Sequence, residues 1–315
     1  MSDEKQSSNK GKAPAAAMVG AMIAIGAGLF VVSNNASNNA KPEVPAEAPQ
    51  TAAAEDPTVQ TAQFGQTETA PTVAQSPPPA DVASALSSDG ASINFRDETL
   101  TFEASFPAGP ANDPVLFVVR NDALTFLASK KSQARATYDE FKKEGVGSPM
   151  WPWEVMIGWD YTAKAGDIVS LAGSAYEFSG GAHGNTQYDT HVARTNGAPI
   201  KVADMLQGGI TPALVIGICE ALKVEKRKRI GTATVYDDPV NCAGPDANVK
   251  IEAAKLALAP SSEADKFGGI HVYWNPYEVG PYVEGPYEIV VQQEVFAMDL
   301  KPEFKPLFAG TAPPL

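Results

Sequence analysis

The chain has 315 residues, which allows one or two domains, and carries a formal net charge of −13 at pH 7. This acidic balance argues against nucleic acid as a partner, because nucleic-acid binding depends on clustered lysine and arginine side chains. It is compatible with a basic protein partner, since complementary charge raises encounter rates, although solubility alone would also explain it.

An uncharged segment near the N-terminus predicts a membrane anchor. Residues 13–32 contain no charged side chain, and as a helix they would span about 30 Å, the thickness of the hydrocarbon core of a bilayer. Lysines in residues 1–12 precede this segment, so the positive-inside rule places a short N-terminal tail in the cytoplasm. The alternative is a cleaved signal peptide, but the apolar run is long for one and residues 36–38 make a poor cleavage site. We expect an uncleaved signal anchor, a single transmembrane helix in a bacterial inner membrane, with the C-terminal domain in the periplasm.

Residues 33–91 are rich in Ala, Pro, Thr, Gln and Glu, contain few aromatic side chains and show no hydrophobic period. Such a composition predicts a disordered linker. As a flexible coil, a segment of roughly 55 residues has an end-to-end distance of about 40 Å. The linker would let the folded part of the chain reach well beyond the membrane.

An N-terminal α+β subdomain is predicted over residues 92–165. Residues 100–106 alternate apolar and polar side chains, which indicates a strand with one buried face. Asp113 before Pro114 is a favourable N-cap and first position for a helix. Apolar side chains then keep helical spacing up to Gly145, the expected stop: Leu116, Val119, Ala123, Leu127, Ala134, Tyr138 and Phe141.

Aromatic and β-branched residues predict a series of strands after this helix. Residues 153–161 and 168–178 form two strands joined by a short turn, and residues 187–194 form the next one. Asn196-Gly197 follows directly and predicts a type I′ hairpin turn. Neighbouring strands joined by hairpins indicate antiparallel sheets.

The last part of the chain, residues 166–310, is assigned to a C-terminal subdomain. It holds a helix that opens at Thr211-Pro212, a possible third helix at 249–258, and strands at 270–274 and 287–291. The basic run at residues 223–229 is expected to complement the helix dipole and to stay in solvent. The predicted fold class is α+β, with antiparallel sheets and packed helices.

Three glycines around a histidine form the most specific pattern in the chain. The run Tyr176-Glu177-Phe178-Ser179-Gly180-Gly181-Ala182-His183-Gly184-Asn185-Thr186 interrupts two strands. Glycine is preferred where φ is positive or where the backbone approaches another group closely. This run resembles the extracytoplasmic domain shared by RsiV-like, lysozyme-sensing anti-sigma factors and PdaC-type peptidoglycan deacetylases. The segment Tyr273-Trp274-Asn275-Pro276-Tyr277-Glu278-Val279-Gly280-Pro281-Tyr282 resembles a late strand and loop of the same family, and the resemblance covers roughly residues 93–304.

The resemblance implies an α+β fold and, by analogy with the anti-sigma factor, binding of lysozyme. We expect neither an anti-sigma role nor deacetylase activity, because no sigma-binding segment precedes the anchor and no deacetylase domain accompanies the motif. The predicted function is a membrane-anchored, non-catalytic periplasmic domain that binds a cell-envelope ligand, either a lysozyme-like protein or peptidoglycan. The alternative is a peptidoglycan-modifying enzyme that uses His183, or an accessory domain of one.

The candidate ligand-binding residues lie in the two segments that carry the resemblance: Gly180, Gly181, His183, Gly184, Trp274, Tyr277 and Tyr282. Tyrosine and tryptophan provide rigid contact area for a sugar ring or a protein partner. A loop that packs on its own sheet would have the same composition. For His183, a hydrogen bond from the ring to the loop backbone is favoured over a ligand contact.

Catalytic and metal chemistry find little support in the sequence. His183, Asp189 and His191 lack a third or fourth ligand at a recognised metal-binding spacing. Ser179 or Ser174 near His183 lacks the G-x-S-x-G nucleophile elbow, and the glycine run lacks the lysine of a P-loop. We expect no catalytic residue, no metal ion and no cofactor.

Cys219 and Cys242 are the only cysteines. Outside the cytoplasm such a pair is expected to be oxidised, so we predict a disulfide between the helix that opens at Thr211-Pro212 and the loop that follows it. In the chain-entropy model this bond would stabilise the fold by roughly 3 kcal/mol.

Overall fold

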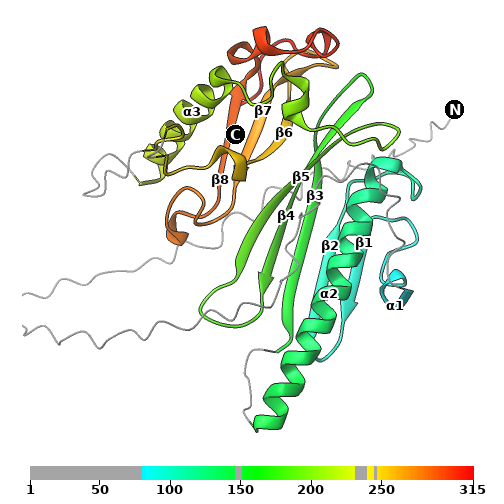
Figure 1. The fold of residues 1–315 in the computed structure, drawn as a ribbon. Coiled ribbons are helices and arrows are strands. Elements are labelled where there is room, and N and C mark those ends of the chain that lie inside the picture. The colour runs from blue at the N-terminus through cyan, green and yellow to red at the C-terminus, as the bar shows by residue number, and fades with distance from the viewer. Residues whose placement is uncertain (1–79, 146–150, 231–239, 245–246) are drawn as a thin grey trace, which may run out of the picture. The chain divides into compact units, whose positions relative to one another are not determined.

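The computed structural model describes residues 80–145, 151–230, 240–244 and 247–315. The helices and strands within these ranges are α1 (Ala80–Ala83), β1 (Ser92–Arg96), β2 (Leu100–Ser105), α2 (Pro114–Glu144), β3 (Trp153–Ala165), β4 (Ile168–Phe178), β5 (Asn185–Arg194), α3 (Pro212–Ile230), β6 (Lys255–Pro260), β7 (Phe267–Trp274) and β8 (Tyr287–Gln292). Short 3₁₀ helices span Val202–Met205, Ile251–Ala253, Tyr282–Glu284, Gln293–Val295, Ala297–Asp299 and Lys305–Leu307. The described strands form a five-stranded sheet in the order β1-β2-β3-β4-β5 and a three-stranded sheet in the order β6-β7-β8 (Figure 1).

The fold is α+β, as predicted, and most strand pairs are antiparallel. One pair departs from the prediction: β2 and β3 are parallel, with Leu100 opposite Trp153. The reason is the connection, because α2 lies between these two strands in the chain and carries it back to the starting end of the sheet. A parallel pair needs such a crossover, whereas a hairpin joins only antiparallel strands.

Helix α2 begins and ends where its sequence predicts. The Asp113 side chain accepts hydrogen bonds from the backbone N–H groups of Val115 and Leu116, and Pro114 occupies the first turn. At the other end Gly145 adopts the left-handed conformation with φ 66°, which glycine reaches without a Cβ clash. Both predicted ends of the helix are therefore confirmed.

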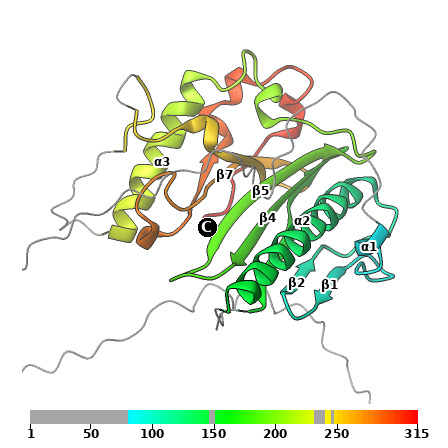
Figure 2. The ribbon, with the colours of Figure 1, turned by 60° about the horizontal axis from the view of Figure 1, so that its bottom comes forward.

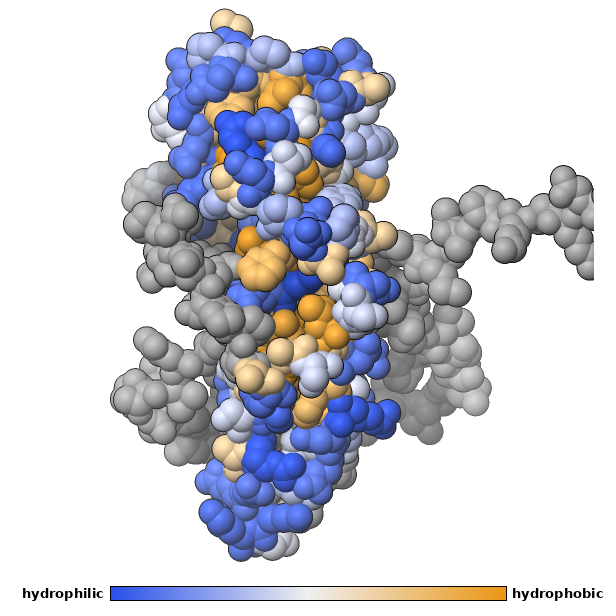
Figure 3. Space-filling view, turned by 90° about the vertical axis from the view of Figure 1, so that its right-hand side faces the viewer, coloured by the Kyte–Doolittle hydropathy of each residue, from blue (hydrophilic) through white to orange (hydrophobic). Residues whose placement is uncertain are grey.

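One face of the five-stranded sheet is covered by α2, and Figure 2 shows β4 and β5 between α2 and α3. The core beneath α2 includes Phe102, Leu116, Leu127, Val155, Ile157 and Leu171. The buried residues of α2 end at Ala134, and the last turn carries Lys142 and Lys143. In Figure 3, which views the side of α2, polar side chains cover the lower end of the face and apolar ones appear across its middle. The first half of α2 is thus a core element, and its last turns extend past the core.

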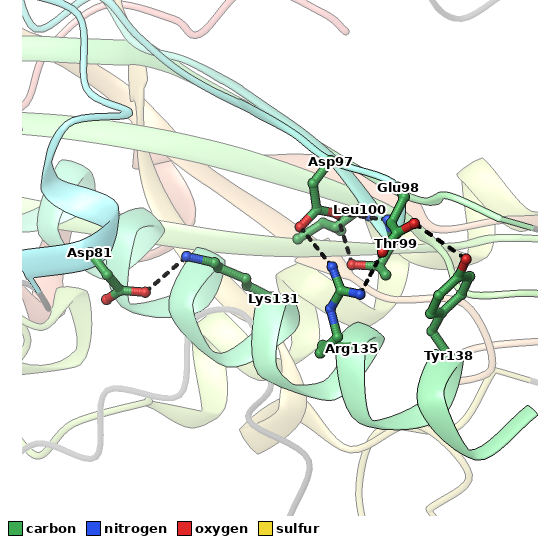
Figure 4. Close-up of polar contacts among 8 residues, drawn as sticks. All are labelled: Asp81, Asp97, Glu98, Thr99, Leu100, Lys131, Arg135 and Tyr138. Atoms are coloured by element: carbon green, nitrogen blue, oxygen red, sulfur yellow. Dashed lines mark hydrogen bonds and ion pairs between the residues drawn. The ribbon is translucent and has the colours of Figure 1, made fainter. Parts of the chain in front are cut away.

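Residues 80–91, which were assigned to the linker, are folded in the structure. Val82 in α1 is fully buried, and Leu86 forms a bridge with Ile93 at the edge of β1. Asp81 forms an ion pair with Lys131 of α2 at 3.0 Å (Figure 4). A residue that buries its side chain against a helix cannot belong to a disordered segment, so the folded part begins earlier than composition alone indicated.

The turn between β1 and β2 is also held against α2. Arg135 contacts Glu98 at 2.7 Å and Asp97 at 3.8 Å, and the Tyr138 hydroxyl donates to Glu98 at 3.3 Å (Figure 4). Asp97 in turn accepts hydrogen bonds from the backbone N–H groups of Thr99 and Leu100. These contacts fix the edge hairpin to the outer part of the helix.

A second core lies between α3, the three-stranded sheet and the end of the β3–β4 hairpin. It includes Ile168, Leu214, Ile218, Val272, Trp274, Tyr287 and Ile289. The Ser170 hydroxyl accepts a hydrogen bond from the backbone N–H of Leu258 at 2.9 Å, so β4 and β6 are joined directly. The two sheets are therefore packed as one unit of the chain.

Two local predictions in the second half of the chain are wrong. The third helix expected at 249–258 is a short 3₁₀ turn followed by β6, whose central residues are buried. A short apolar run is compatible with either a buried strand or a helix, and here its pairing with β7 makes it a strand.

The second wrong prediction concerns the turn at Asn196-Gly197. The hairpin exists, but only Gly197 has positive φ, so the turn is not type I′. Arg194 donates to Ala198, which makes this a three-residue loop.

The predicted boundary between subdomains at residues 165 and 166 coincides with the turn of the β3–β4 hairpin. Both strands belong to the five-stranded sheet and pair along their whole length. The structure places the change of architecture later, after β5, where the chain enters α3 and the three-stranded sheet. Cutting at the hairpin would separate the two central strands of a single sheet.

The predictions for the cytoplasmic tail (1–12), the anchor (13–32) and residues 33–79 of the linker fall outside the described residues. Among the helices that the structure describes, none is both long and apolar enough to cross a bilayer.

Candidate functional site

The glycine run forms the loop between β4 and β5, and its glycines are structurally required. Gly180 and Gly181 have φ values of 109° and 94°, in the region that favours glycine. A Cβ atom on Gly184 would overlap the ring of Tyr176. The loop is therefore shaped by missing side chains, as the sequence pattern predicted.

His183 and Tyr282 stack on one another, although they lie far apart in the chain. Their ring centroids are 3.8 Å apart and their planes differ by 19°. Both rings also bond the same acceptor: the Tyr282 hydroxyl donates to the Gly184 carbonyl at 2.5 Å, and His183 Nδ1 lies 3.0 Å from that oxygen. The bond from the His183 ring to the loop backbone is present as predicted.

A second contact brings the same two segments together. The backbone N–H of Tyr188, near the start of β5, donates to the side-chain oxygen of Asn275 at 2.6 Å. The expectation that the glycine run and the 273–282 segment lie side by side is thus confirmed. Both segments connect neighbouring strands, and the two sheets bring the connections to one place.

Tyr277 has an unusual backbone conformation for an aromatic residue. Its φ is 72°, and Asp265 is the other described non-glycine residue with positive φ. The residue is 67 % exposed, and its ring centroid lies 5.6 Å from that of Tyr282. A bond from the Asn275 N–H to the Glu278 carboxylate closes the turn at 2.6 Å. His183 and Tyr277 are exposed and Tyr282 is partly buried, and we call the rings of these three residues the aromatic surface.

The basic end of α3 supports the loop that carries Tyr282. The Arg229 guanidinium lies 4.3 Å from the centroid of the Tyr287 ring, and its Nη1 donates to the carbonyl oxygens of Glu284 and Pro286. Lys226 donates to the Val279 carbonyl at 3.3 Å. The expectation that the whole basic run stays in solvent is wrong for Lys226, whose side chain is 5 % exposed. The loop provides acceptors that replace water around this charge.

Trp274 is placed away from the aromatic surface. It is fully buried in the core beneath α3, and its Nε1 lies 3.4 Å from the carbonyl oxygen of Lys250. Successive side chains on a strand point to opposite faces, so the end of β7 directs Trp274 into this core. Trp274 therefore cannot contact a ligand on the aromatic surface, and its role is structural.

A buried polar cluster at β7 and β8 was missed in the sequence. His271 Nδ1 lies 3.0 Å from the Tyr273 hydroxyl, which also bonds Glu288, and the Tyr188 and Tyr273 ring centroids are 5.1 Å apart. Burial lowers the pKa of His271 to about 4, so the ring is neutral at pH 7. The signal was available, because His271 and Tyr273 are alternate residues of a strand and share a face.

A second polar cluster lies between α2 and β5. Burial raises the pKa of Asp122 to about 6 and that of Asp189 to about 7, and the nearby Asp122 charge adds to the effect on Asp189. Burial also lowers the pKa of His191 to about 4. His183 is exposed on the loop that precedes β5, while His191 is partly buried within β5 opposite Leu171, so the two histidines do not form one site. Within the described ranges, no group of three or more His, Cys, Asp or Glu side chains could hold a metal ion.

The predicted disulfide is confirmed. Cys219 on α3 is bonded to Cys242, with the two Cα atoms 5.9 Å apart. It ties the helix that supports the Tyr282 loop to the segment at 240–244. Together with Lys226 and Arg229, this bond fixes the position of α3 relative to the aromatic surface.

Comparison with known proteins agrees with this geometry. Residues 38–186 match the family model described as Deacetylase PdaC, and residues 259–294 match that of DUF3298, a protein family of unknown function. The first match ends with the glycine run, and the second includes the segment that carries Tyr277 and Tyr282. The resemblance to PdaC-type domains is confirmed, and the chain carries a domain of the PdaC/DUF3298 type. These families indicate a domain related to the cell envelope.

Two solved structures illustrate the similarity. A DUF3298 family member from Bacteroides fragilis is 16 % identical, covers 68 % of this chain and 93 % of its own, and has a TM-score of 0.45. A DUF3298 family protein from Pseudomonas aeruginosa is 18 % identical, covers 69 % of this chain and 91 % of its own, and has the same TM-score of 0.45. No curated protein matches the chain.

Proposed function

We propose that this domain is a non-catalytic recognition domain that binds a cell-envelope ligand through the aromatic surface. The ligand is peptidoglycan or a lysozyme-like protein. In this proposal residues 13–32 anchor the chain in a bacterial inner membrane, and residues 33–79 tether the domain in the periplasm. The observation that carries the proposal is the conformation of Tyr277.

Positive φ costs a non-glycine residue of order 1–3 kcal/mol, and such strain persists mainly at functional sites. At Tyr277 the strained backbone holds a large ring in solvent, with 67 % of the residue exposed. A ring that served only the core would be buried, and a turn that needed only positive φ would carry glycine or asparagine. A contact with another molecule explains both the strain and the exposure.

The aromatic surface suits either proposed ligand. Exposed tyrosine rings bury large areas at low entropy cost and are frequent hot spots in interfaces. The stack of His183 on Tyr282 holds both rings in place before a ligand arrives, which lowers the entropy lost on binding. The net charge of −13 adds attraction toward a basic, lysozyme-like protein.

Two of the three histidines are poorly placed for catalysis, because His191 and His271 are partly buried and burial lowers their pKa values. A general base needs a free ring nitrogen within reach of the substrate. His183 Nδ1 is engaged with the Gly184 carbonyl, which leaves Nε2 of this exposed ring as the nitrogen that an enzyme would use. Catalysis is therefore tested directly by the turnover assay described below.

Sedimentation with purified peptidoglycan sacculi and pull-down with lysozyme, both with the full chain, test the proposal. Tyr277→Asn removes the ring and relieves the backbone, so it should weaken binding at least about tenfold. Val283→Asn is the matched control, because Val283 is 90 % exposed on the same loop and belongs to none of the stacked rings. Binding of neither ligand at micromolar concentration, or equal loss in both variants, would contradict the proposal.

The alternative is a peptidoglycan-modifying enzyme, or an accessory domain of one, and the family description Deacetylase PdaC favours its inclusion. This alternative predicts that the protein turns over muropeptides. His183→Ala should abolish that turnover and leave the thermal unfolding curve unchanged. Binding without turnover would eliminate the enzyme and leave the recognition domain.

A further inference from the structure

A cavity of about 400 Å³ opens beside the first turn of α2, far from the aromatic surface. It is lined by Asp113, Val115, Tyr161, Thr162, Ala163, Lys164, Val169 and Thr195. Its walls are the start of α2, the end of β3, the start of β4 and the turn that follows β5. The aromatic surface lies at the other end of β4, roughly 30 Å away at the rise of a strand. The two sites are therefore independent.

The floor of the cavity is apolar and its rim is polar. Val115, Ala163 and Val169 are buried, whereas Lys164 is exposed and Tyr161 is 44 % exposed. Small-molecule sites combine these features: an apolar floor supplies affinity and a few polar groups orient the ligand. The volume also falls within the usual range of such sites, roughly 300–1,000 Å³.

One carboxylate oxygen of Asp113 at the rim takes no part in capping the helix. Asp113 Oδ1 accepts both capping hydrogen bonds, from the N–H groups of Val115 and Leu116. Asp113 Oδ2 and the Tyr161 hydroxyl converge on Gly109, at 3.8 and 3.9 Å from the position that a Cβ atom would occupy there. A Cβ on Gly109 would also lie 2.8 Å from a methyl group of Leu116. This rim therefore presents a carboxylate oxygen and a hydroxyl group together.

Another part of the rim carries the opposite charge. Lys164 lies at the end of β3 and is exposed, and the ion pairs found among the described residues do not include it. The cavity thus holds one cation and one anion, and no ion pair joins them. Thr162 and Thr195 belong to the same lining, although the Thr162 hydroxyl already donates to Ser170 at 2.8 Å. A neutral apolar ligand would form an ion pair with neither Lys164 nor Asp113, and a simple ion would pair with only one of them.

We propose that this cavity binds a small zwitterion of amino-acid type, such as a short free peptide. Its carboxylate pairs with Lys164, its ammonium group with Asp113 Oδ2 and the Tyr161 hydroxyl, and its side chains contact the apolar floor. A volume of about 400 Å³ lies in the range of sites that hold small organic ligands, which includes a dipeptide. The inference does not rest on the function proposed for the aromatic surface.

The test is a calorimetric and NMR titration of the full chain with L-alanyl-L-alanine. Two analogues each lack one charge: the N-acetylated dipeptide lacks the ammonium group, and the dipeptide amide lacks the carboxylate. We expect the dipeptide to bind and each analogue to bind at least about tenfold more weakly, because each leaves one rim charge without a partner. No binding of the dipeptide, or equal affinity for all three probes, would overturn the proposal.

Two substitutions assign the charges. Lys164→Gln should weaken the dipeptide and remove the discrimination against the amide, while discrimination against the N-acetylated probe remains. Asp113→Asn should also weaken binding of the dipeptide, but it should remove the discrimination against the N-acetylated probe and keep that against the amide. Asparagine still caps the helix, so α2 should remain intact. Lys143→Gln, at the exposed end of α2, is the matched control and should bind like the unmodified chain. The site would be contradicted if both variants still distinguished the dipeptide from its two analogues. It would also be contradicted if the NMR chemical-shift changes on titration occurred at Tyr277 and not at Thr162 and Thr195.

Discussion

Where helix α2 packs on the edge strand β5, two acids are partly buried, whereas helix α3 buries a base against a loop. Asp122 on α2 and Asp189 on β5 both have pKa values raised by burial, and the Asp122 charge raises the pKa of Asp189 further. Lys226 on α3 lies against the Val279 carbonyl and 3.8 Å from the Glu284 carboxylate, and Arg229 bonds two further carbonyls. For Asp189 the cost of desolvation outweighs its favourable contacts, a backbone N–H and the Lys255 charge, whereas the bases bond backbone carbonyls directly.

This difference indicates which part of the domain changes its stability with pH. Buried acids become charged as the pH rises, so the packing of α2 on β5 weakens at neutral pH. On the α3 side, Lys226 and Arg229 bond backbone carbonyl oxygens, which carry no titratable proton, and these bonds support the Tyr282 loop. A recognition surface benefits from such support, because its geometry must not vary with conditions.

The largest expected effect is loss of the disulfide on the α3 side. Replacing Cys219 and Cys242 by serine should lower the free energy of unfolding by roughly 3 kcal/mol, because the unfolded chain gains the freedom of the closed loop. Urea unfolding of both proteins measures it. As a control, a reducing agent should destabilise the unmodified chain and leave the double variant unchanged. Equal stability of the two proteins would show that the other contacts of α3 suffice.

The next largest effect is expected from Asp189, the acid beneath α2, on the pH dependence of stability. The folded-state pKa of Asp189 is about 7, above about 3.9 for an unfolded chain, so the folded state binds the proton more tightly. Stability from this group is therefore full below about pH 4, falls as the pH rises, and is lost above about pH 7. Asp189→Asn should stabilise the fold by about 2 kcal/mol at about pH 8 and hardly at about pH 4.

Thermal unfolding at both pH values measures this contrast, and Glu103→Gln on the exposed side of β2 is the control. A stabilisation that is independent of pH would mean that the carboxylate charge is not the cause.

A smaller effect is expected at Arg229. Arg229→Gln removes the stack on Tyr287 and two bonds to carbonyls, so the loop at residues 279–286 should exchange its amide hydrogens faster and stability should fall by about 1 kcal/mol. Arg229→Lys keeps the charge but not the fork of donors, and should rescue only part of the loss. Arg227→Gln, exposed on the same helix, should leave the exchange unchanged.

The smallest effect on stability is expected at Tyr277. Tyr277→Asn should leave the melting temperature unchanged or raise the stability by up to about 1 kcal/mol, because asparagine tolerates positive φ better than tyrosine. Differential scanning calorimetry beside the binding assay measures it. A marked destabilisation would show that the ring supports the fold and would remove the main argument for the aromatic surface.

Local sequence patterns determined many features of this protein. The caps at Asp113 and Gly145, the β3–β4 hairpin, the helix that opens at Pro212 and the oxidised cysteine pair all follow from neighbouring residues or from residue type. Such features depend on backbone geometry over a few residues, which the sequence specifies directly. The two family-like segments were recognised in the same way.

Tertiary structure decided the rest, because it depends on which segments meet. The parallel pairing of β2 and β3, the strand β6 in place of a helix, and the burial of Val82 all follow from the packing of α2 and the two sheets. The stack of Tyr282 on His183 joins residues almost a hundred positions apart, and Trp274 faces the core only because β7 pairs with that register. The raised pKa of Asp189 comes from desolvation beneath a helix, and no pattern along the chain records that environment.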